Sequence, residues 1–195
     1  MEIVLARHGE TEWSRDRRHT GRTDIPLIED GRRQAAALRA AIAGRRFERV
    51  LSSPLSRALE TCRLAGLGDQ AEVTADLCEW DYGVYEGITT AEIRERRPGW
   101  NLWRDGCPGG ETAADVGRRV DRVIAPLEGG EGDVAVFAHG HVLRVLTARW
   151  LGLPPEAGAL FKLDTGTLSF LGYERETRAI TRWNVQVAAA APARR

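Results

Sequence analysis

Two short apolar runs in this sequence each lead into a histidine followed by a glycine, and this repeated arrangement constrains the fold more than any other feature. The first run, Ile3–Leu5, leads into His8-Gly9, and the second, Val134–Ala138, leads into His139-Gly140. Apolar runs of this length are typical of strands that are covered on both faces of a parallel sheet. If both strands are central and parallel, the two histidines meet at the carboxyl edge of the sheet, where open α/β sheets bind ligands.

The remaining residues predict a chain in which helices and strands alternate. Helical periodicity and cap residues predict helices over residues 30–44, 54–64, 89–97, 112–127 and 142–151. Apolar runs and alternation predict further strands over residues 47–51, 72–74, 160–164, 167–173 and 179–183. We expect Asp30 to cap the first helix. We also expect a serine of the Ser52-Ser53 pair to cap the second, with Pro54 in its first helical position.

This pattern predicts an α/β fold, a three-layer α/β/α sandwich with a mostly parallel central sheet and helices on both faces. A length of 195 residues suits one domain, which we place at residues 1–187. No repeat or linker divides the chain. The tail over residues 188–195 consists of small residues, a proline and two terminal arginines, and we expect it to be disordered.

The charge balance narrows the classes of partner. The chain has 28 basic and 28 acidic residues, so no overall positive field draws it to nucleic acid or to a membrane, and any anion site has to be local. The three cysteines, Cys62, Cys78 and Cys107, lack metal-ligand spacing, which indicates reduced thiols in a cytoplasmic protein. We expect neither a signal peptide nor a membrane span, because the sequence lacks both patterns.

Candidate catalytic residues gather where strands end and helices begin. Arg7 and His8 follow the first apolar run, and Arg57 falls in the first turn of the helix after the 47–51 strand. A guanidinium binds phosphate through paired hydrogen bonds, and a neutral imidazole can act as a nucleophile. Taken singly, each has an ordinary alternative, as a polar residue at a strand end or a surface arginine on a helix.

An acidic, aromatic-rich loop at residues 77–87 supplies a candidate general acid, Glu79. Aromatic walls around a carboxyl group favour its protonated form, which a proton donor requires near neutral pH. The alternative is a tight turn with packed aromatic side chains and solvated carboxylates.

Two other segments each have two interpretations. The basic run 15–22 is either a solvated loop or a rim that binds a second phosphate, and residues 98–110 form either a lid or a side wall of the pocket.

Together these residues suit phosphoryl transfer. One imidazole attacks phosphorus, while two guanidiniums and the second imidazole neutralise charge on the transferred group. A carboxylic acid protonates the leaving alkoxide and then deprotonates the water that hydrolyses the phosphohistidine, a contribution of roughly 10²–10⁴-fold. Because arginines supply the positive charge, the reaction requires no metal and no other cofactor.

Four short motifs resemble those of the histidine phosphatase superfamily, also called phosphoglycerate mutase-like. They are Arg7–Thr11, Ser52–Ala58, Glu79–Gly87 and His139-Gly140, in the family's order. The resemblance implies the same fold, with one antiparallel strand at an edge of the sheet. It implies that His8 is the nucleophile and Glu79 the proton donor, and that phosphate is bound by Arg7, Arg57 and His139.

The resemblance also implies substrate contacts. Ser14, Thr20 and Gly21 fall at positions where the family often contacts phosphate or substrate, and we group Arg22, His139 and Gly140 with them as candidate substrate-binding residues. We interpret His141 as a structural or supporting residue, because no further ligands accompany the H-x-H spacing that could suit zinc. We expect His19 in the basic loop to be solvated.

A narrower resemblance points to the sedoheptulose-1,7-bisphosphatase branch, which hydrolyses phosphorylated sugars. It rests on Thr11–Ser14, Glu79–Gly87, Trp100–Cys107 and Phe137–Arg144. Ser14 departs from the asparagine usual in the mutases, and the chain lacks their long insertion and C-terminal extension, which favours hydrolysis. We therefore expect a phosphatase that acts on small phosphorylated metabolites, as a monomer or a homodimer. The alternatives are a phosphoglycerate mutase, a phosphoprotein phosphatase and a non-catalytic phosphate-binding module.

Overall fold

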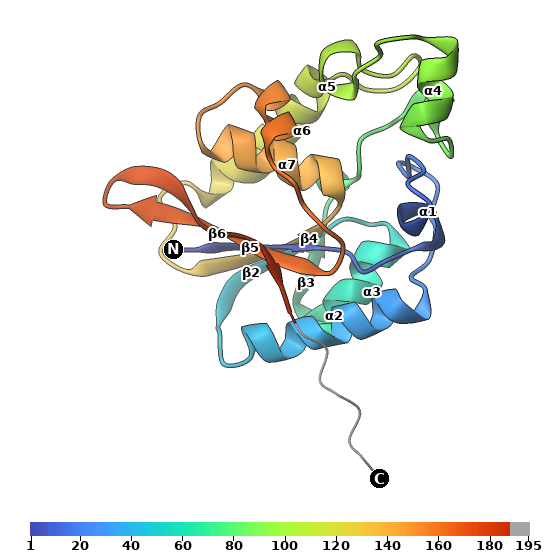
Figure 1. Cartoon of the computed structure of the whole chain (residues 1–195). Helices are drawn as coiled ribbons and strands as arrows, with labels where there is room; N and C mark the ends of the chain where they lie inside the picture. Colours follow the sequence, from blue (N-terminus) through green and yellow to red (C-terminus); the bar gives the residue numbers. More distant parts are fainter. Residues whose placement is uncertain (188–195) are drawn as a thin grey trace.

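A six-stranded sheet with the order β3-β2-β4-β1-β5-β6 forms the centre of the molecule (Figure 1). This computed structural model describes residues 1–187, so the tail expected at 188–195 lies outside the described residues. The strands are β1 (Ile3–Arg7), β2 (Phe47–Ser52), β3 (Ala71–Val73), β4 (Asp133–Ala138), β5 (Thr167–Glu174) and β6 (Thr177–Gln186). The α-helices are α1 (Glu12–Arg15), α2 (Glu29–Ile42), α3 (Ser56–Leu64), α4 (Thr90–Arg96), α5 (Leu102–Asp105), α6 (Ala113–Ile124) and α7 (Gly140–Trp150).

The sheet is mostly parallel, as predicted. Strands β1, β2, β3 and β4 run in one direction, and β5 pairs antiparallel with both β1 and β6. The antiparallel strand is therefore second from the edge rather than at the edge as the resemblance implied, because β6 folds back beside β5. The two predicted histidine-bearing strands, β1 and β4, are neighbours at the centre.

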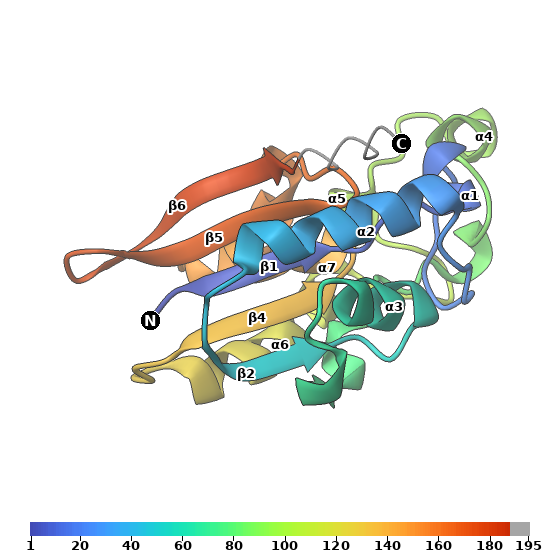
Figure 2. The same ribbon diagram turned by 90° about the horizontal axis from the view of Figure 1, so that it is seen from below.

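Helices cover both faces of the sheet, which confirms the three-layer α/β/α sandwich. Helices α2 and α3 lie on one face, and α6 and α7 lie on the other (Figures 1 and 2). Successive residues of β1 alternate between the two layers: Ile3 and Leu5 pack with the α6 and α7 core, and Val4 packs with Leu38 of α2. Burial on both faces explains why this strand has a continuous apolar run.

Two predicted helix caps were wrong, because acidic or hydroxyl side chains near a helix start do not always cap it. Helix α2 begins after Ile28 without a side-chain cap, and Asp30 lies inside its first turn, where it pairs with Arg33. Helix α3 begins at Ser56, so Pro54 precedes the helix. The Ser56 amide instead donates to the carboxylate of Asp24, at 2.9 and 3.2 Å, from a loop distant in sequence.

The strand predicted at residues 160–164 was also wrong. A 3₁₀-helix spans Pro155–Leu160, and the chain then runs as irregular structure to β5. The predicted lid or wall at residues 98–110 contains α5 and buries Trp100 at 2% exposure. Trp103 lies behind the cavity described below, with its ring 5.4 Å from His141 and under the guanidinium of Arg144. This segment therefore supports the wall of the cavity from behind.

Within residues 1–187, no helix is long and apolar enough to cross a membrane. Helices α1 and α4 lie beyond the carboxyl ends of β1 and β4 (Figure 1). The sheet therefore presents its carboxyl edge to loops and short helices that can shape a binding site there.

Candidate active site

The two predicted histidines meet at the carboxyl edge of the sheet. Arg7 of β1 pairs in register with Ala138 of β4, so the residues that follow, His8 and His139, lie side by side with ring centroids 5.1 Å apart. Gly9 allows the backbone to pass close to α2, because a Cβ there would lie 2.1 Å from the Gly31 carbonyl oxygen. The parallel register of β1 and β4 thus builds the centre of the site.

His8 has the form that a nucleophile requires. Its Nδ1 lies 2.7 Å from the carbonyl oxygen of Gly9, so Nδ1 carries the proton and donates it, which leaves the Nε2 lone pair free. Burial, together with the charges of Arg57 and Arg7, holds the pKa of His8 well below its ordinary value of 6.5. The imidazole is therefore neutral near pH 7, and its ring lines a cavity.

Arg7 lines the same cavity, and the hydrogen-bonding capacity of its guanidinium is not filled by the described residues. Its Nη1 donates to the carbonyl oxygen of Leu163, and its buried Nε has no partner among residues 1–187. Gly140 leaves space for this guanidinium, because a Cβ there would lie 3.2 Å from the Arg7 Cζ. A buried guanidinium with unpaired donors suits an anionic oxygen.

Arg57 and His139 lie beneath the cavity rather than along its lining. Both side chains are fully buried, and the Arg57 Nε donates to the His139 Nδ1 at 3.1 Å. The other His139 nitrogen, Nε2, therefore carries the proton and donates to the hydroxyl of Ser53 at 2.7 Å. Three further hydrogen bonds of Arg57 go to loop carbonyl oxygens, those of Thr20, Gly21 and Thr23. Both side chains therefore lie next to His8, and, beyond burial, the charge of Arg57 contributes to the low pKa of that histidine.

Glu79 lines the cavity at the N-terminus of α7. Its Oε1 accepts hydrogen bonds from the backbone amides of Trp80 and Val142, each at 2.9 Å, and its Oε2 accepts one from His141 at 2.9 Å. The predicted aromatic neighbours are present, but the direct contacts of the carboxylate are these amides. Helix N-termini hold carboxylates through such bonds, so Glu79 is fixed in position by α7.

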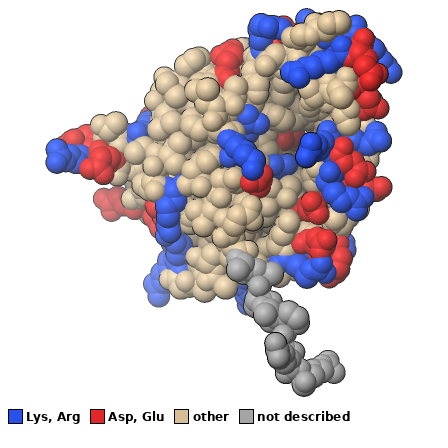
Figure 3. Space-filling model, in the orientation of Figure 1, with Lys and Arg blue, Asp and Glu red and all other residues tan. Residues whose placement is uncertain are grey.

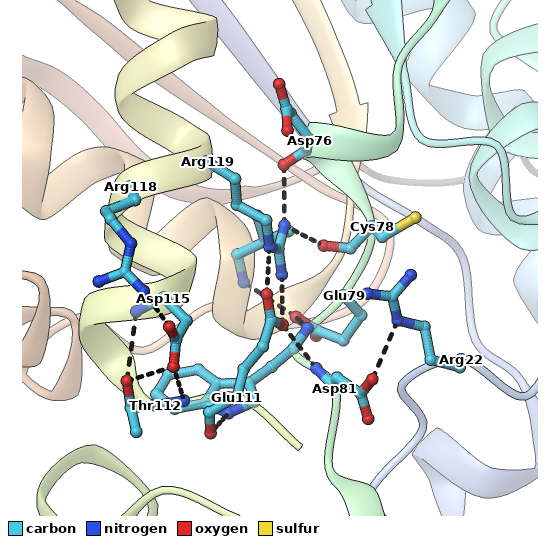
Figure 4. Close-up of polar contacts among 12 residues, drawn as sticks. Arg22, Asp76, Cys78, Glu79, Asp81, Glu111, Thr112, Asp115, Arg118 and Arg119 are labelled. Atoms are coloured by element: carbon cyan, nitrogen blue, oxygen red, sulfur yellow. Dashed lines mark hydrogen bonds and ion pairs between the residues drawn. The ribbon is translucent and has the colours of Figure 1, made fainter. Parts of the chain in front are cut away.

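An ion pair that the sequence reasoning missed holds the Glu79 loop from below. Arg119 of α6 donates to both carboxylate oxygens of Glu111, at 2.8 and 3.0 Å, and to the carbonyl oxygens of Asp76 and Cys78, at 2.8 and 2.6 Å (Figure 4). Glu111 also accepts from the Asp81 amide at 2.8 Å. These contacts tie both flanks of the Glu79 loop to α6, and we name them the Arg119 clamp.

A signal for this clamp does exist in the sequence. Arg119 lies three residues after Val116 and four before Val123, so it falls within the apolar stripe of the predicted 112–127 helix. An arginine on a buried face requires a partner, although the pattern does not say which residue provides it. Arg119 is 7% exposed in the structure.

The cavity has a volume of about 190 Å³ and a strongly basic lining. Four arginines and one carboxylate contribute to it: Arg7, Arg17, Arg18, Arg144 and Glu79. Figure 3 shows basic side chains on both sides of a hollow in this face of the molecule. The positive charge is therefore local, as expected for a chain with balanced charges, and the size suits a small phosphorylated molecule.

The structure divides the predicted substrate-binding residues into two groups. Ser14, Thr20 and Gly140 line the cavity. Gly21 is buried and its amide donates to the Oε1 of Glu86 at 2.8 Å, while Arg22 is exposed and pairs with Asp81 at 3.4 Å. His139 lies beneath the cavity, as described above. Gly21, Arg22 and His139 therefore lie outside the cavity lining.

Two other histidines line the cavity. We expected His19 to be solvated, but its ring packs against Tyr82, with centroids 4.7 Å apart. Burial lowers the pKa of His19 to about 4. His141 lies beside Glu79, and its Nδ1 is 2.6 Å from the Tyr82 hydroxyl. Tyr82 and Arg144 also line the cavity, and motif reasoning had given neither a role. No cluster of three potential metal ligands occurs within residues 1–187.

An α/β sandwich with this basic cavity at the carboxyl edge of its parallel strands has the fold and the site of a phosphoryl-transfer enzyme. The model of the histidine phosphatase superfamily (branch 1) matches residues 3–186, and the chain belongs to this superfamily.

Named relatives agree with this assignment. An acid phosphatase of Mycobacterium tuberculosis is 42% identical over 182 residues, which cover 91% of this chain and 89% of the relative. A sedoheptulose 1,7-bisphosphatase of Saccharomyces cerevisiae is 37% identical, and the match covers 77% of this chain and 67% of the relative. A solved structure of an open reading frame product of Mycobacterium tuberculosis superimposes with a TM-score of 0.90 at 38% identity, over 96% of this chain and 98% of the other. The protein is a phosphatase, a phosphoric monoester hydrolase.

Proposed function

We propose that this phosphatase hydrolyses monoesters of small metabolites, in particular sugar phosphates and bisphosphates, without a metal and through a phosphohistidine on His8. One observation carries the proposal: His8 lines the same cavity as Glu79, its ring is buried and neutral, and its Nδ1 is hydrogen-bonded to the Gly9 carbonyl oxygen, which leaves Nε2 free to attack. Its relatives include a sedoheptulose bisphosphatase, which supports a sugar as the leaving group.

In the first step, the His8 Nε2 attacks phosphorus and the bond from phosphorus to the leaving oxygen breaks. Glu79, in its protonated form, gives its proton to that oxygen, so an alcohol departs rather than an alkoxide. Arg7, which lines the cavity, binds the equatorial oxygens of the phosphoryl group through its guanidinium. The Gly9 carbonyl oxygen keeps the proton on Nδ1 and stabilises the positive charge that the phosphorylated ring acquires.

In the second step, the Glu79 carboxylate takes a proton from water as the water oxygen attacks phosphorus. The bond from phosphorus to Nε2 breaks, inorganic phosphate leaves, and His8 returns to its neutral form. Arg57 and His139 position the phosphorylated ring from beneath, and the Arg57 guanidinium holds positive charge nearby. The same residues therefore serve both steps, with Glu79 exchanging the roles of acid and base.

A second phosphate has a place at the rim of the cavity. Arg17 and Arg18 from the basic run, and Arg144 from α7, line the cavity together with Arg7. These four arginines supply more positive charge than one phosphoryl group needs, which supports bisphosphorylated substrates.

The test is phosphate release by the purified protein from a panel of sugar phosphates, sugar bisphosphates and phosphoglycerates, with EDTA present and His8→Ala as the control. We expect release from sugar esters by the wild-type protein and none by the variant. Isomerised phosphoglycerate, formed only when 2,3-bisphosphoglycerate is added, would establish a mutase. Substrate binding without any turnover would establish a phosphate-binding module.

A further inference from the structure

Tyr82 and His141 form a hydrogen-bonded pair in the wall of the cavity, and the steps proposed above do not use it. The Tyr82 hydroxyl lies 2.6 Å from the His141 Nδ1. Burial raises the pKa of Tyr82 well above its ordinary value of 10, so the phenol keeps its proton. Burial, with the Arg144 charge, lowers the pKa of His141 well below 6.5, so the ring is neutral. The phenol therefore donates to Nδ1, which leaves the single ring proton on Nε2.

The Nε2 of His141 is a donor without a partner inside the described part of the chain. Within residues 1–187, the fully buried side-chain polar atoms that lack hydrogen bonds are the Arg7 Nε and the Trp150 Nε1. The His141 Nε2 makes no hydrogen bond there and is absent from that set, so it is open to solvent. Because His141 lines the cavity, this opening places the N–H within reach of a bound molecule.

The ring of His141 is held in one orientation. Trp80, Trp103 and Tyr82 pack near it, with ring centroids 6.2, 5.4 and 5.9 Å away, and His19 packs against Tyr82. These three aromatic neighbours, together with the bond to Tyr82, leave the imidazole little freedom to turn. A donor fixed in this way discriminates between ligands better than a mobile one.

The position of this donor identifies the part of the substrate that it contacts. The His141 amide donates to the Oε2 of Glu79 at 2.9 Å, and its Nδ1 lies 3.9 Å from the same oxygen. Glu79 gives its proton to the leaving oxygen, so His141 lies on the leaving-group side of the cavity. An N–H there is matched by an oxygen acceptor close to the ester bond.

We propose that His141, with its tautomer set by Tyr82, is a specificity-determining residue whose Nε2–H recognises a hydroxyl oxygen near the ester of the leaving group. This inference rests on the proposed hydrolysis and adds the substrate feature that the site reads: a polyhydroxylated leaving group. A leaving group without that hydroxyl leaves the N–H unpaired within the bound complex, which costs affinity in the transition state.

The experiment compares glycerol 1-phosphate with n-propyl phosphate, which differ only in their hydroxyl groups. For the wild-type protein we expect kcat/KM to be roughly 5- to 100-fold higher for glycerol 1-phosphate. Tyr82→Phe keeps the ring but loses the donor that sets the tautomer, and we expect kcat/KM to fall more for glycerol 1-phosphate than for propyl phosphate, so that most of the preference is lost. His141→Phe should lose the preference as well, and His141→Gln, whose amide can place an N–H near Nε2, should restore part of it.

Tyr85→Phe is the matched control, because Tyr85 also packs among aromatic rings, 5.2 Å from Trp100, and is not part of the cavity lining. We expect it to retain the wild-type preference. Equal losses on both esters in Tyr82→Phe would mean a structural role and would overturn the inference. If the wild-type protein hydrolyses both esters equally well, the recognition by His141 fails while the proposed function stands. If it hydrolyses no sugar phosphate of the panel above, the proposed function fails first.

Discussion

Removal of the Glu111 carboxylate tests the Arg119 clamp beneath the Glu79 loop. Glu111→Ala takes away the acceptor for two Arg119 donors and for the Asp81 amide. The pair is mostly buried, with side-chain exposures of 8% for Arg119 and 17% for Glu111. Loss of one partner from a buried ion pair costs about 3–5 kcal/mol. Because Arg119 keeps two carbonyl acceptors, we expect the lower end, about 3 kcal/mol, for the free energy of unfolding.

In a chain of this size, each kcal/mol shifts the Tm by about 2–4 °C, so we expect Glu111→Ala to unfold about 6–12 °C below the wild type. At a temperature where both proteins are folded, we also expect kcat to fall roughly 10- to 100-fold, because a loosened loop displaces Glu79. Thermal unfolding followed by circular dichroism and phosphate release measure the two effects.

Arg118→Ala is the matched control on the same helix. Arg118 pairs with Asp115 at the surface, with 66% of its side chain exposed, so we expect a change of about 0.5 kcal/mol or less. The double variant Glu111→Leu/Arg119→Met separates stability from positioning. Apolar replacement of a buried pair restores stability, but it supplies no donor for the Asp76 and Cys78 carbonyl oxygens, so kcat should stay low. A Glu111→Ala protein with wild-type Tm and wild-type kcat would refute the clamp.

Three further predictions follow from the site. Glu79→Gln should lower kcat about 10²–10⁴-fold with little change in substrate binding, measured by steady-state kinetics and by titration with inorganic phosphate. His8 and His139 are neutral when folded and regain a pKa near 6.5 on unfolding, so the unfolded chain binds more protons in acid. Stability should therefore be complete above about pH 6.5 and fall as the pH drops below it, with a shallower fall in His139→Gln; a Tm that rises in acid would contradict this. Arg17→Ala/Arg18→Ala should raise KM for sugar bisphosphates and leave KM for monophosphates nearly unchanged; equal effects on both would contradict a second phosphate at this rim.

The sequence predicted the parts of the molecule that depend on local pattern. The apolar run of β1, the His8 that follows it and the equivalent run before His139 can be read from the sequence, because burial on two faces requires consecutive apolar residues. The parallel pairing of β1 and β4 then followed from topology. The main layers of the fold and the meeting of the histidines were predictable for this reason.

The contacts that complete the site come from residues far apart in the chain. The amides at the N-termini of α3 and α7 bond to Asp24 and Glu79 from other loops, so local residues do not identify the partner at either start, and the serine cap predicted for α3 was wrong. We expected Arg57 to bind phosphate, and in the structure it donates hydrogen bonds to loop carbonyl oxygens and to His139. His19 was expected in solvent but packs on an aromatic ring from another segment. Such partners depend on how the loops fold over the sheet edge, which residue spacing does not encode.

Trapping of the phosphorylated enzyme tests the central claim most directly. The protein is mixed with a labelled sugar phosphate and quenched within one turnover, and the digested peptides are analysed by mass spectrometry under alkaline conditions, which preserve phosphohistidine. We expect one phosphoryl group on the peptide that contains His8, absent from the His8→Ala variant and longer-lived in Glu79→Gln, where no carboxylate activates water. Phosphate release by His8→Ala at the wild-type rate, or a phosphoryl group on another residue, would contradict the account.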